Sequence, residues 1–377
     1  MKRVAVIMAG GSGERFWPKS RRDRPKQLLD LLSAGKSMIE QSIERISQII
    51  PHGHIFIITS ERLLEPMRQA LPQIPDANIV AEPCKRNTAP ALALAAAFVA
   101  ARYSAQGFSS DKISMAVLTA DQDIRPIGGF KKTVDNALDY VENNEVLGTI
   151  GIPPARPETG YGYIEVAEPF SEENGELQIK PVKRFTEKPD SATAEKFFNA
   201  GNYLWNSGMF FWRLDTFIEK MKKHAPEIGE MIPEMIKKYE VYTNIPLAGA
   251  NEKIGEIFNN FPNISIDYSL MEKADNVVVA RALFAWDDIG AWDALERIWE
   301  HDERGNISSG VCSLVETKDS IIVNSEAKGQ RLVATLGLEK IVVVVTDDAI
   351  MICPKDRVQE VKKIVEDIDN HYGDKWL

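Results

Sequence analysis

The sequence predicts an α/β protein with a large, mostly parallel sheet domain and a small β-rich tail. Short apolar runs alternate with helical patterns over the first third of the chain, as in folds whose strands are joined by crossover helices. After about Asn306 the pattern changes to short β runs separated by turns, and an amphipathic helix follows. A chain of 377 residues is also long for one core. We therefore expect one domain over residues 1–300 and a second over 301–377.

The first domain begins with an alternation of strand and helix patterns. Val4 to Met8 is a β-branched run that ends in glycines, which predicts a buried strand feeding a loop. Ser37 and Glu40 have the spacing of a capping box at the start of a helix. Further strands are predicted at 55–59, 78–81 and 113–119, and further helices at 63–71 and 90–103. This order predicts a Rossmann-like parallel sheet with helices on both faces.

The rest of the chain has a mixed pattern. Strands are predicted at 161–167, 182–186 and 277–286, and a helix at 292–299. In the tail, short strands are predicted at 311–315, 320–323, 332–336 and 341–346, and no internal repeat is apparent. Pro354 is a favourable first residue for the last helix, which has its apolar residues on one face.

The composition is that of a folded protein, and it excludes several classes of function. Hydrophobic residues make up 44% of the chain and charged residues 27%. The net charge of −10 argues against a nucleic-acid coat, which needs a broad basic surface. No apolar run approaches the length of a membrane span, so we expect no membrane partner. The three cysteines have no metal-binding spacing and fit a reducing, cytoplasmic location.

The most informative segment is a glycine-rich loop after the first strand, formed by Ala9, Gly10, Gly11, Ser12 and Gly13. A dinucleotide fingerprint would need glycine where Phe16 stands, and Gly13-Glu14-Arg15 lacks the lysine of a P-loop. Glycines allow backbone N–H groups to approach a polyphosphate, and Arg15 and Lys26 add positive charge. Three more cations would raise the local potential: Arg21, Arg22 and Arg24. In an acidic chain this basic cluster favours a triphosphate site over the alternative of a plain turn with surface cations.

Together with Pro25-Lys26-Gln27, the run from Gly10 to Pro18 resembles the signature of the mannose-1-phosphate guanylyltransferases, or GDP-mannose pyrophosphorylases. Further segments resemble motifs of that family in the same order along the chain. They are 82–91, 119–121, 158–164, 185–189, 205–209, 266–268 and 286–292. The resemblance covers nearly the whole chain.

The resemblance implies a glycosyltransferase-A-like nucleotidyltransferase domain with a β-helix-like tail. It also implies the reaction GTP + α-D-mannose 1-phosphate = GDP-mannose + diphosphate, with Mg²⁺ as cofactor. Longer members of the family carry a further domain with phosphomannose isomerase activity. This sequence ends at Leu377, so we expect a short form with the transferase activity alone.

The resemblance further implies the metal ligands and the phosphate-binding residues. Asp121 and Asp288 would hold Mg²⁺, although the neighbouring Asp287 leaves open which of the two adjacent carboxylates touches the metal. Arg15 would bind the β- and γ-phosphates, and Lys26 would lie nearer the α-phosphate. Gln122 stands where the family usually has a histidine, so a titrating group is not expected at that position.

The same motifs imply residues for the sugar phosphate and the base. Lys188 is expected to bind the sugar phosphate and Glu187 the sugar hydroxyls, with the alternative that they form a mere surface pair. Asn206 and the backbone of Gly160 would assist at the sugar. The base would be met by Glu82, Asn87 and Thr88. Asn87 and Thr88 also suit the N-cap of the helix that follows, and the two roles are compatible.

The expected chemistry needs charge neutralisation rather than a general base. A sugar-phosphate oxygen is already an anion near pH 7, and it attacks the α-phosphorus while pyrophosphate leaves. Two alternatives stay open: a transferase for another sugar-1-phosphate, and a non-catalytic sugar-nucleotide sensor on the same fold. Phe16 argues against a nicotinamide oxidoreductase. GTP and mannose-1-phosphate are the expected ligands, while a homodimer and the role of the tail are left open.

Overall fold

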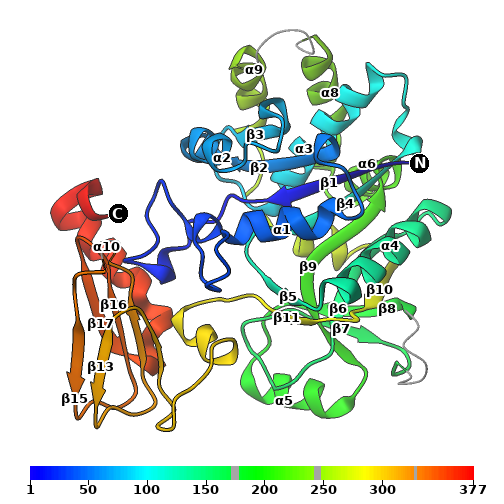
Figure 1. Ribbon diagram of the computed structural model, residues 1–377. Coiled ribbons are helices and arrows are strands. Elements are labelled where there is room, and N and C mark those ends of the chain that lie inside the picture. The colour runs from blue at the N-terminus through cyan, green and yellow to red at the C-terminus, as the bar shows by residue number, and fades with distance from the viewer. Residues whose placement is uncertain (171–177, 242–247, 327–328) are drawn as a thin grey trace. The chain divides into compact units, whose positions relative to one another are not determined.

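The computed structural model describes residues 1–170, 178–241, 248–326 and 329–377 (Figure 1). Contacts divide the chain into two units. The large unit consists of Met1–Gly10, Ser42–Thr119 and Ile124–Trp286, and the tail unit of Gly11–Gln41, Ala120–Asp123 and Asp287–Leu377. Most of the glycine-rich loop therefore belongs to the tail unit. These contact-based units are not the domains predicted over residues 1–300 and 301–377, and that domain boundary stays a prediction.

A nine-stranded sheet forms the centre of the large unit, in the order β3-β2-β1-β4-β9-β6-β10-β8-β7. Its strands are β1 (Lys2–Met8), β2 (Ile55–Ser60), β3 (Ile79–Glu82), β4 (Ile113–Thr119), β6 (Leu147–Ile152), β7 (Tyr163–Val166), β8 (Ile179–Thr186), β9 (Tyr203–Arg213) and β10 (Val277–Arg281). β1 to β4 pair in parallel, as predicted, and so do β6 and β10.

The strand β9 changes the direction of the sheet, and the sequence patterns do not reveal it. It lies between β4 and β6 and runs antiparallel to both. β8 and β7 add further antiparallel pairs. Because both of its faces are largely buried, β9 lacks the polar–apolar alternation by which a strand is recognised. The predicted parallel arrangement thus holds for part of the sheet, and the rest is mixed.

Helices cover both faces of this sheet. α3 (Thr88–Ser104) is buried almost all round, and it packs with α6 (Leu214–His224) and α8 (Ile232–Val241) on the face that carries Val4 and Val6. Ala5 and Ile7 are also fully buried, and they point to the other face because side chains alternate along a strand. The remaining α-helices of the described residues are α1 (Met38–Ser47), α2 (Leu64–Ala70), α4 (Ile127–Asn143), α5 (Ser191–Ala200), α7 (Pro226–Gly229), α9 (Ala248–Phe258) and α10 (Val361–Tyr372).

The predicted capping box is present at the start of α1. The N–H and the hydroxyl of Ser37 both donate to Glu40 Oε2, at 2.8 and 2.6 Å.

The predicted strand over 277–286 is instead two strands, β10 and β11 (Ala285–Asp287), and β11 pairs with β5 (Asp123–Arg125). The chain leaves the sheet between them, where the Leu283 N–H donates to the Thr133 hydroxyl at 3.2 Å. The predicted helix at 292–299 is a 3-10 helix over Trp292–Arg297.

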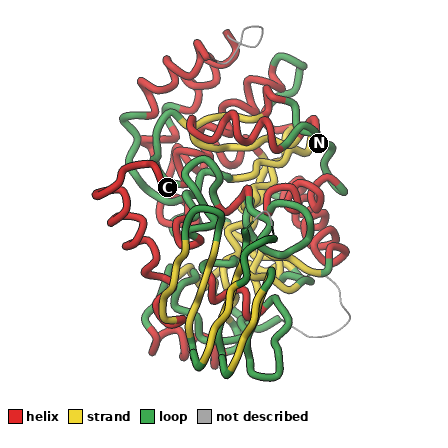
Figure 2. Tube along the Cα trace, turned by 60° about the vertical axis from the view of Figure 1, so that its left-hand side comes forward, coloured by secondary structure: helices red, strands yellow, loops and turns green. Residues whose placement is uncertain are grey.

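The tail unit contains a ladder of short parallel strands (Figure 2). β12 (Ile307–Ser309), β14 (Ile321–Asn324) and β16 (Ile341–Val345) pair in parallel, and β17 (Ile350–Pro354) is antiparallel to β16. Beside them, β13 (Cys312–Val315) pairs in parallel with β15 (Val333–Leu336). Ile307 pairs with Ile321, and Ile321 pairs with Val342, so the number of residues between paired positions changes from one strand pair to the next. Unequal spacings leave no fixed period in the sequence, which explains why no repeat is apparent there.

The segment that follows the glycine-rich loop shares one hydrophobic core with the tail strands. Phe16 and Trp17 are buried in a cluster that includes Trp292 and Val342. The Trp17 indole N–H donates to the carbonyl of Trp376 at 2.9 Å. The last helix, α10, packs against the 3-10 turn that begins at Glu14. The tail strands and helix therefore position the residues that follow the glycine-rich loop.

The end of the chain differs from the prediction in one respect. Pro354 is the last residue of β17 rather than the first residue of a helix. A 3-10 helix follows over Lys355–Glu360, and the α-helix begins only at Val361. Among the described residues, no helix combines the length and the apolar composition that a membrane span requires.

Candidate functional site

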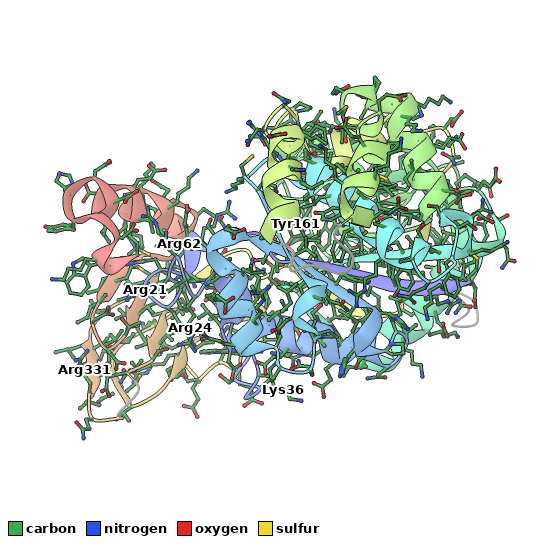
Figure 3. All side chains as sticks on the ribbon, turned by 90° about the horizontal axis from the view of Figure 1, so that it is seen from above. Arg21, Arg24, Lys36, Arg62, Tyr161 and Arg331 are labelled. Carbon is green, nitrogen blue, oxygen red and sulfur yellow. The ribbon has the colours of Figure 1, made fainter. Side chains whose placement is uncertain are left out.

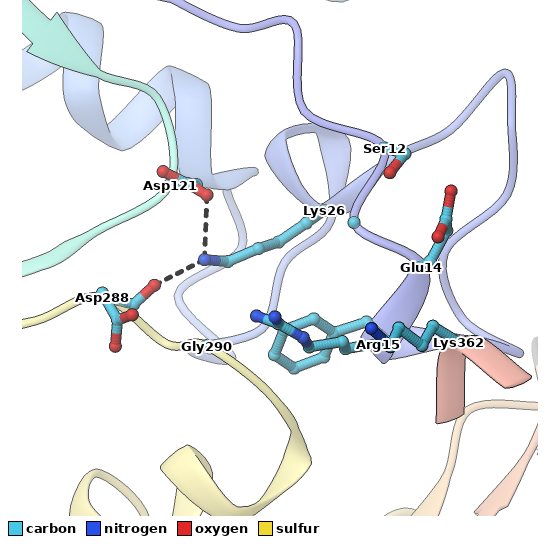
Figure 4. A pocket seen from close by; sticks show the side chains of 10 residues that line it. Ser12, Glu14, Arg15, Lys26, Asp121, Asp288, Gly290 and Lys362 are labelled. Atoms are coloured by element: carbon cyan, nitrogen blue, oxygen red, sulfur yellow. Dashed lines mark hydrogen bonds and ion pairs between the residues drawn. The ribbon is translucent and has the colours of Figure 1, made fainter. Parts of the chain in front are cut away.

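A polar pocket of about 420 Å³ lies within the tail unit (Figure 4). Its walls combine the glycine-rich loop with residues from segments that are far away in the sequence. The lining residues are Ser12, Gly13, Glu14, Arg15, Phe16, Lys26, Asp121, Asp288, Gly290 and Lys362. Six of the predicted site residues are thus brought together in one pocket: Ser12, Gly13, Arg15, Lys26, Asp121 and Asp288.

Gly13 brings the loop against the segment that carries Lys26. Its φ of 63° lies in the left-handed region, where L side chains are strained. A Cβ at this position would lie 2.6 Å from the backbone nitrogen of Lys26. Only glycine permits this close approach, which sets the position of Lys26 relative to the loop.

Lys26 is a buried cation at the centre of the pocket's polar contacts. Its ammonium donates to Asp121 Oδ2 at 3.0 Å and to the carbonyl oxygen of Asp288 at 2.6 Å. The same nitrogen lies 5.8 Å from the centre of the Phe16 ring. A buried ammonium needs such partners, because an unpaired charge away from water is costly. Lys26 therefore joins the two segments that carry the predicted metal ligands.

The two adjacent aspartates have different surroundings. The carboxylate of Asp287 accepts hydrogen bonds from Arg297 at 2.5 and 2.9 Å and from the Ile289 N–H at 2.8 Å. Asp288 instead lines the pocket with Asp121. Carboxylate oxygens of this kind suit a hard cation such as Mg²⁺. In the described part of the chain, no cluster of three or more His, Cys, Asp or Glu side chains has metal-binding geometry.

A second group of predicted residues lies together in the large unit. Lys188 Nζ lies 3.1 Å from Glu187 Oε1, and the Lys188 side chain is largely exposed. The Asn206 amide donates to Asp267 Oδ1 at 2.8 Å. Burial, with the nearby Glu187 charge as a second cause, raises the pKa of Asp267 to about 6. Asp267 was not predicted as a site residue, although its segment belongs to one of the recognised motifs.

The recognised segment 158–164 lies beside this second group. A Cβ on Gly162 would lie 2.4 Å from Glu187 Oε2, so glycine allows the loop to approach that carboxylate. The N–H of Gly160, predicted to assist at the sugar, donates to Glu158 Oε1 at 3.0 Å. Tyr161, which Figure 3 labels, packs edge-on against Trp205, with ring centres 5.2 Å apart.

Three residues predicted to meet the base lie at the start of α3 and the end of β3. Asn87 caps α3, and its side-chain oxygen accepts the Thr88 N–H at 2.9 Å. The Thr88 hydroxyl accepts the Ile266 N–H at 2.9 Å. The N-cap alternative is therefore realised at Asn87. Burial raises the pKa of Glu82 to about 7, with Lys85 acting in the opposite direction.

The first residues of the glycine-rich loop belong to the large unit. The Ala9 N–H donates to the Ile58 carbonyl at 2.8 Å, and the Ala9 carbonyl accepts from Thr59 at 3.1 Å. Its backbone groups thus extend the sheet. A Cβ on Gly10 would lie 3.0 Å from Glu82 Oε1, so Gly10 allows a close approach to that carboxyl. Gly11, in the tail unit, accepts a hydrogen bond from the Gln27 amide at 3.0 Å.

Two of the cations expected to raise the pocket's potential have other partners. Arg21 donates to the Trp376 carbonyl and pairs with Asp348 at 2.7 Å. Arg22 pairs with Asp369 at 2.6 Å. Each of these two arginines therefore pairs with a carboxylate of the tail, which offsets its positive charge, and the expectation that they raise the pocket's potential stays a prediction. Conversely, Lys362 lines the pocket, although its distance along the chain from the loop gave no signal of this.

Comparisons with known proteins agree with this architecture. Residues 4–305 match the nucleotidyl transferase family model, and residues 312–368 match a MannoseP isomerase/GMP-like beta-helix domain. A mannose-1-phosphate guanylyltransferase of Escherichia coli is 33% identical over 97% of this chain and 75% of its own length. One of Klebsiella pneumoniae is 37% identical over 96% of this chain and 73% of its own. A crystal structure from Thermus thermophilus, named mannose-1-phosphate geranyltransferase, has a TM-score of 0.81 at 30% identity and covers 98% of this chain and 100% of its own.

Proposed function

The chain belongs to the nucleotidyl transferase family, and we propose that it is the enzyme that converts GTP and α-D-mannose 1-phosphate into GDP-mannose and diphosphate. The observation that carries the proposal is the pocket in which Arg15, Lys26, Asp121 and Asp288 converge on the glycine-rich loop. The choice of guanine and mannose rests on relatives that bear that activity in their names over nearly the whole chain.

We assign the phosphates of GTP to the pocket of the tail unit. The backbone from Gly11 to Gly13 would meet phosphate oxygens with its N–H groups. Arg15, whose side chain is exposed in the pocket, would bind the β- and γ-phosphates with its planar fork of donors. Lys26 would lie nearer the α-phosphate, where its buried ammonium opposes the charge that develops during transfer.

We assign the sugar phosphate to the second group in the large unit. Lys188 would exchange its contact with Glu187 for the sugar phosphate, and Glu187 would then accept from sugar hydroxyls. Asn206 is held by Asp267, which leaves a fixed amide beside them. Glu82, with Asn87 and Thr88, would meet the base, in addition to the capping role of Asn87.

The transfer forms one bond and breaks one. An oxygen of the mannose phosphate attacks the α-phosphorus of GTP, and the bond from that phosphorus to the β-phosphate oxygen breaks, so diphosphate leaves. The attacking oxygen is already ionised, so the residues need only align two anions and balance their charge. Mg²⁺, held by Asp121 and Asp288 with the phosphates, would supply further neutralisation. We place this reaction in the reducing cytoplasm, in keeping with free thiols at Cys84, Cys312 and Cys353.

The test is diphosphate release by the purified protein, with each common nucleoside triphosphate crossed against mannose-1-phosphate, glucose-1-phosphate and a heptose-1-phosphate, with and without Mg²⁺. We expect release only where GTP, mannose-1-phosphate and Mg²⁺ are all present. Release with another pair would keep the reaction class and discard the assigned substrates. No release with any pair, from protein that binds GTP, would indicate a sugar-nucleotide sensor instead.

A further inference from the structure

We propose that Lys362, on the last helix of the tail, binds the β- and γ-phosphates of the nucleotide together with Arg15. The inference deepens the proposed function and rests on it. Lys362 lines the same pocket as Gly13 and Arg15 (Figure 4). Its helix, α10, packs against the turn that carries Arg15. No sequence motif singled this residue out.

The charges of the pocket explain why a third cation is needed. The lining holds three carboxylates, from Glu14, Asp121 and Asp288, against Arg15, Lys26 and Lys362. Lys26 is already paired with Asp121. Without Lys362 the lining would carry a net negative charge and would repel a triphosphate. With Lys362 the protein charges balance, so this side chain makes the pocket more attractive to a polyphosphate both with and without a divalent cation.

Of the three cations that line the pocket, Arg15 and Lys362 are available to a ligand. Within the described ranges, no carboxylate is paired with Arg15 or with Lys362. Lys362 is exposed in the first turn of α10, so its ammonium is accessible to a ligand in the pocket.

The tail holds Lys362 in place through the core that it shares with the loop. Val361 and Val365 of α10 are buried in the same cluster as Phe16 and Trp17. The backbone on either side of Lys362 is thus anchored against the residues that flank Arg15. The tail is in this way a part of the nucleotide site, and its helix contributes a phosphate contact.

The neighbouring lysine provides a matched control. Lys363 pairs with Glu360 at 2.7 Å, and it does not line the pocket. Consecutive side chains on a helix point about 100° apart, so the two lysines face different surroundings. Substitution of either one removes the same charge from the same turn of the same helix.

The experiment compares the full chain with Lys362→Ala, Lys362→Arg and Lys363→Ala. It measures the Kd of diphosphate by calorimetry with Mg²⁺, and the KM values for GTP and for mannose-1-phosphate. For Lys362→Ala we expect the diphosphate Kd and the GTP KM to rise about tenfold, as for a lost hydrogen bond to a charged group. The KM for mannose-1-phosphate should change less than twofold, Lys362→Arg should recover most of the loss, and Lys363→Ala should match the wild type.

The outcomes separate this inference from the proposed function. A Lys362→Ala protein that binds diphosphate as the wild type does overturns the inference, and so does an equal loss in Lys363→Ala. A wild type that does not bind diphosphate also overturns it. If the wild type binds diphosphate but transfers no nucleotide, the proposed function fails, and the Kd values still report on Lys362. If Lys362→Ala unfolds, Lys362→Gln takes its place, with melting curves as the check on folding.

Discussion

Substitution of Gly13 by alanine is the sharpest test of how the pocket is built. The added Cβ would lie 2.6 Å from the Lys26 backbone nitrogen and 2.7 Å from Lys26 Cβ, so one of the two backbones must move by several tenths of an ångström. The left-handed conformation of Gly13 costs an alanine about 1–2 kcal/mol, and the overpacking adds about 1–3 kcal/mol. Displacement of a substrate-positioning group by about 1 Å lowers activity roughly 100-fold. We therefore expect Gly13→Ala to lose about 2–5 kcal/mol of unfolding free energy and roughly 10- to 100-fold in kcat/KM for GTP.

Gly35 offers a control with the same backbone strain and no collision. Its φ is 73°, and a Cβ there meets nothing within 4 Å. Gly35→Ala should therefore lower the unfolding free energy by about 1–2 kcal/mol and leave kcat/KM unchanged. Urea unfolding curves give the two free energies, and diphosphate release at varied GTP gives the activities. If the two variants have equal activity, the contact between the loop and Lys26 does not position the phosphates, and the reasoning is wrong.

Three further predictions follow from the site. Asp288→Asn should remove nearly all turnover. Asp287→Asn should lose the charge pair with Arg297, at a cost of about 1 kcal/mol, while its amide oxygen still accepts the Ile289 N–H and turnover is kept. Comparable turnover in both variants would remove Asp288 from the site. Lys188→Ala should raise the KM for mannose-1-phosphate at least about tenfold more than the KM for GTP, and equal rises in steady-state kinetics would contradict its role. Burial raises the pKa of Asp267 from 3.8 to about 6, so the stability that its protonated form contributes is present below pH about 4 and lost as the pH rises through 6. Between pH about 4 and 7, the unfolding free energy of the wild type should thus fall by about 3 kcal/mol relative to that of Asp267→Asn, as measured by urea unfolding. A difference between the two proteins that is constant with pH would refute the explanation.

Local sequence chemistry alone determined much of this protein. The run from Val4 to Met8 is β-branched and apolar, so it forms a buried strand, and the glycines after it form a loop where helix and strand propensities end. Ser37 and Glu40 form their capping box because the bonds lie within one helical turn. The loop, the elements of the first half and the family resemblance all depend on residues that are close in the chain.

Only the tertiary structure decided which side chains share a pocket. Asp287 and Asp288 are adjacent and identical, and the difference between them comes from Arg297 beside one and the pocket beside the other. Arg21 follows the glycine-rich loop in the sequence and was expected to raise its potential, and only the structure shows that it donates to the carbonyl of Trp376. Lys362 lies far from the loop in sequence and reaches its pocket because α10 packs there. Propensity and capping act over a few neighbouring residues, whereas the partner of a charge is set by packing between segments distant in the chain, which no local pattern encodes.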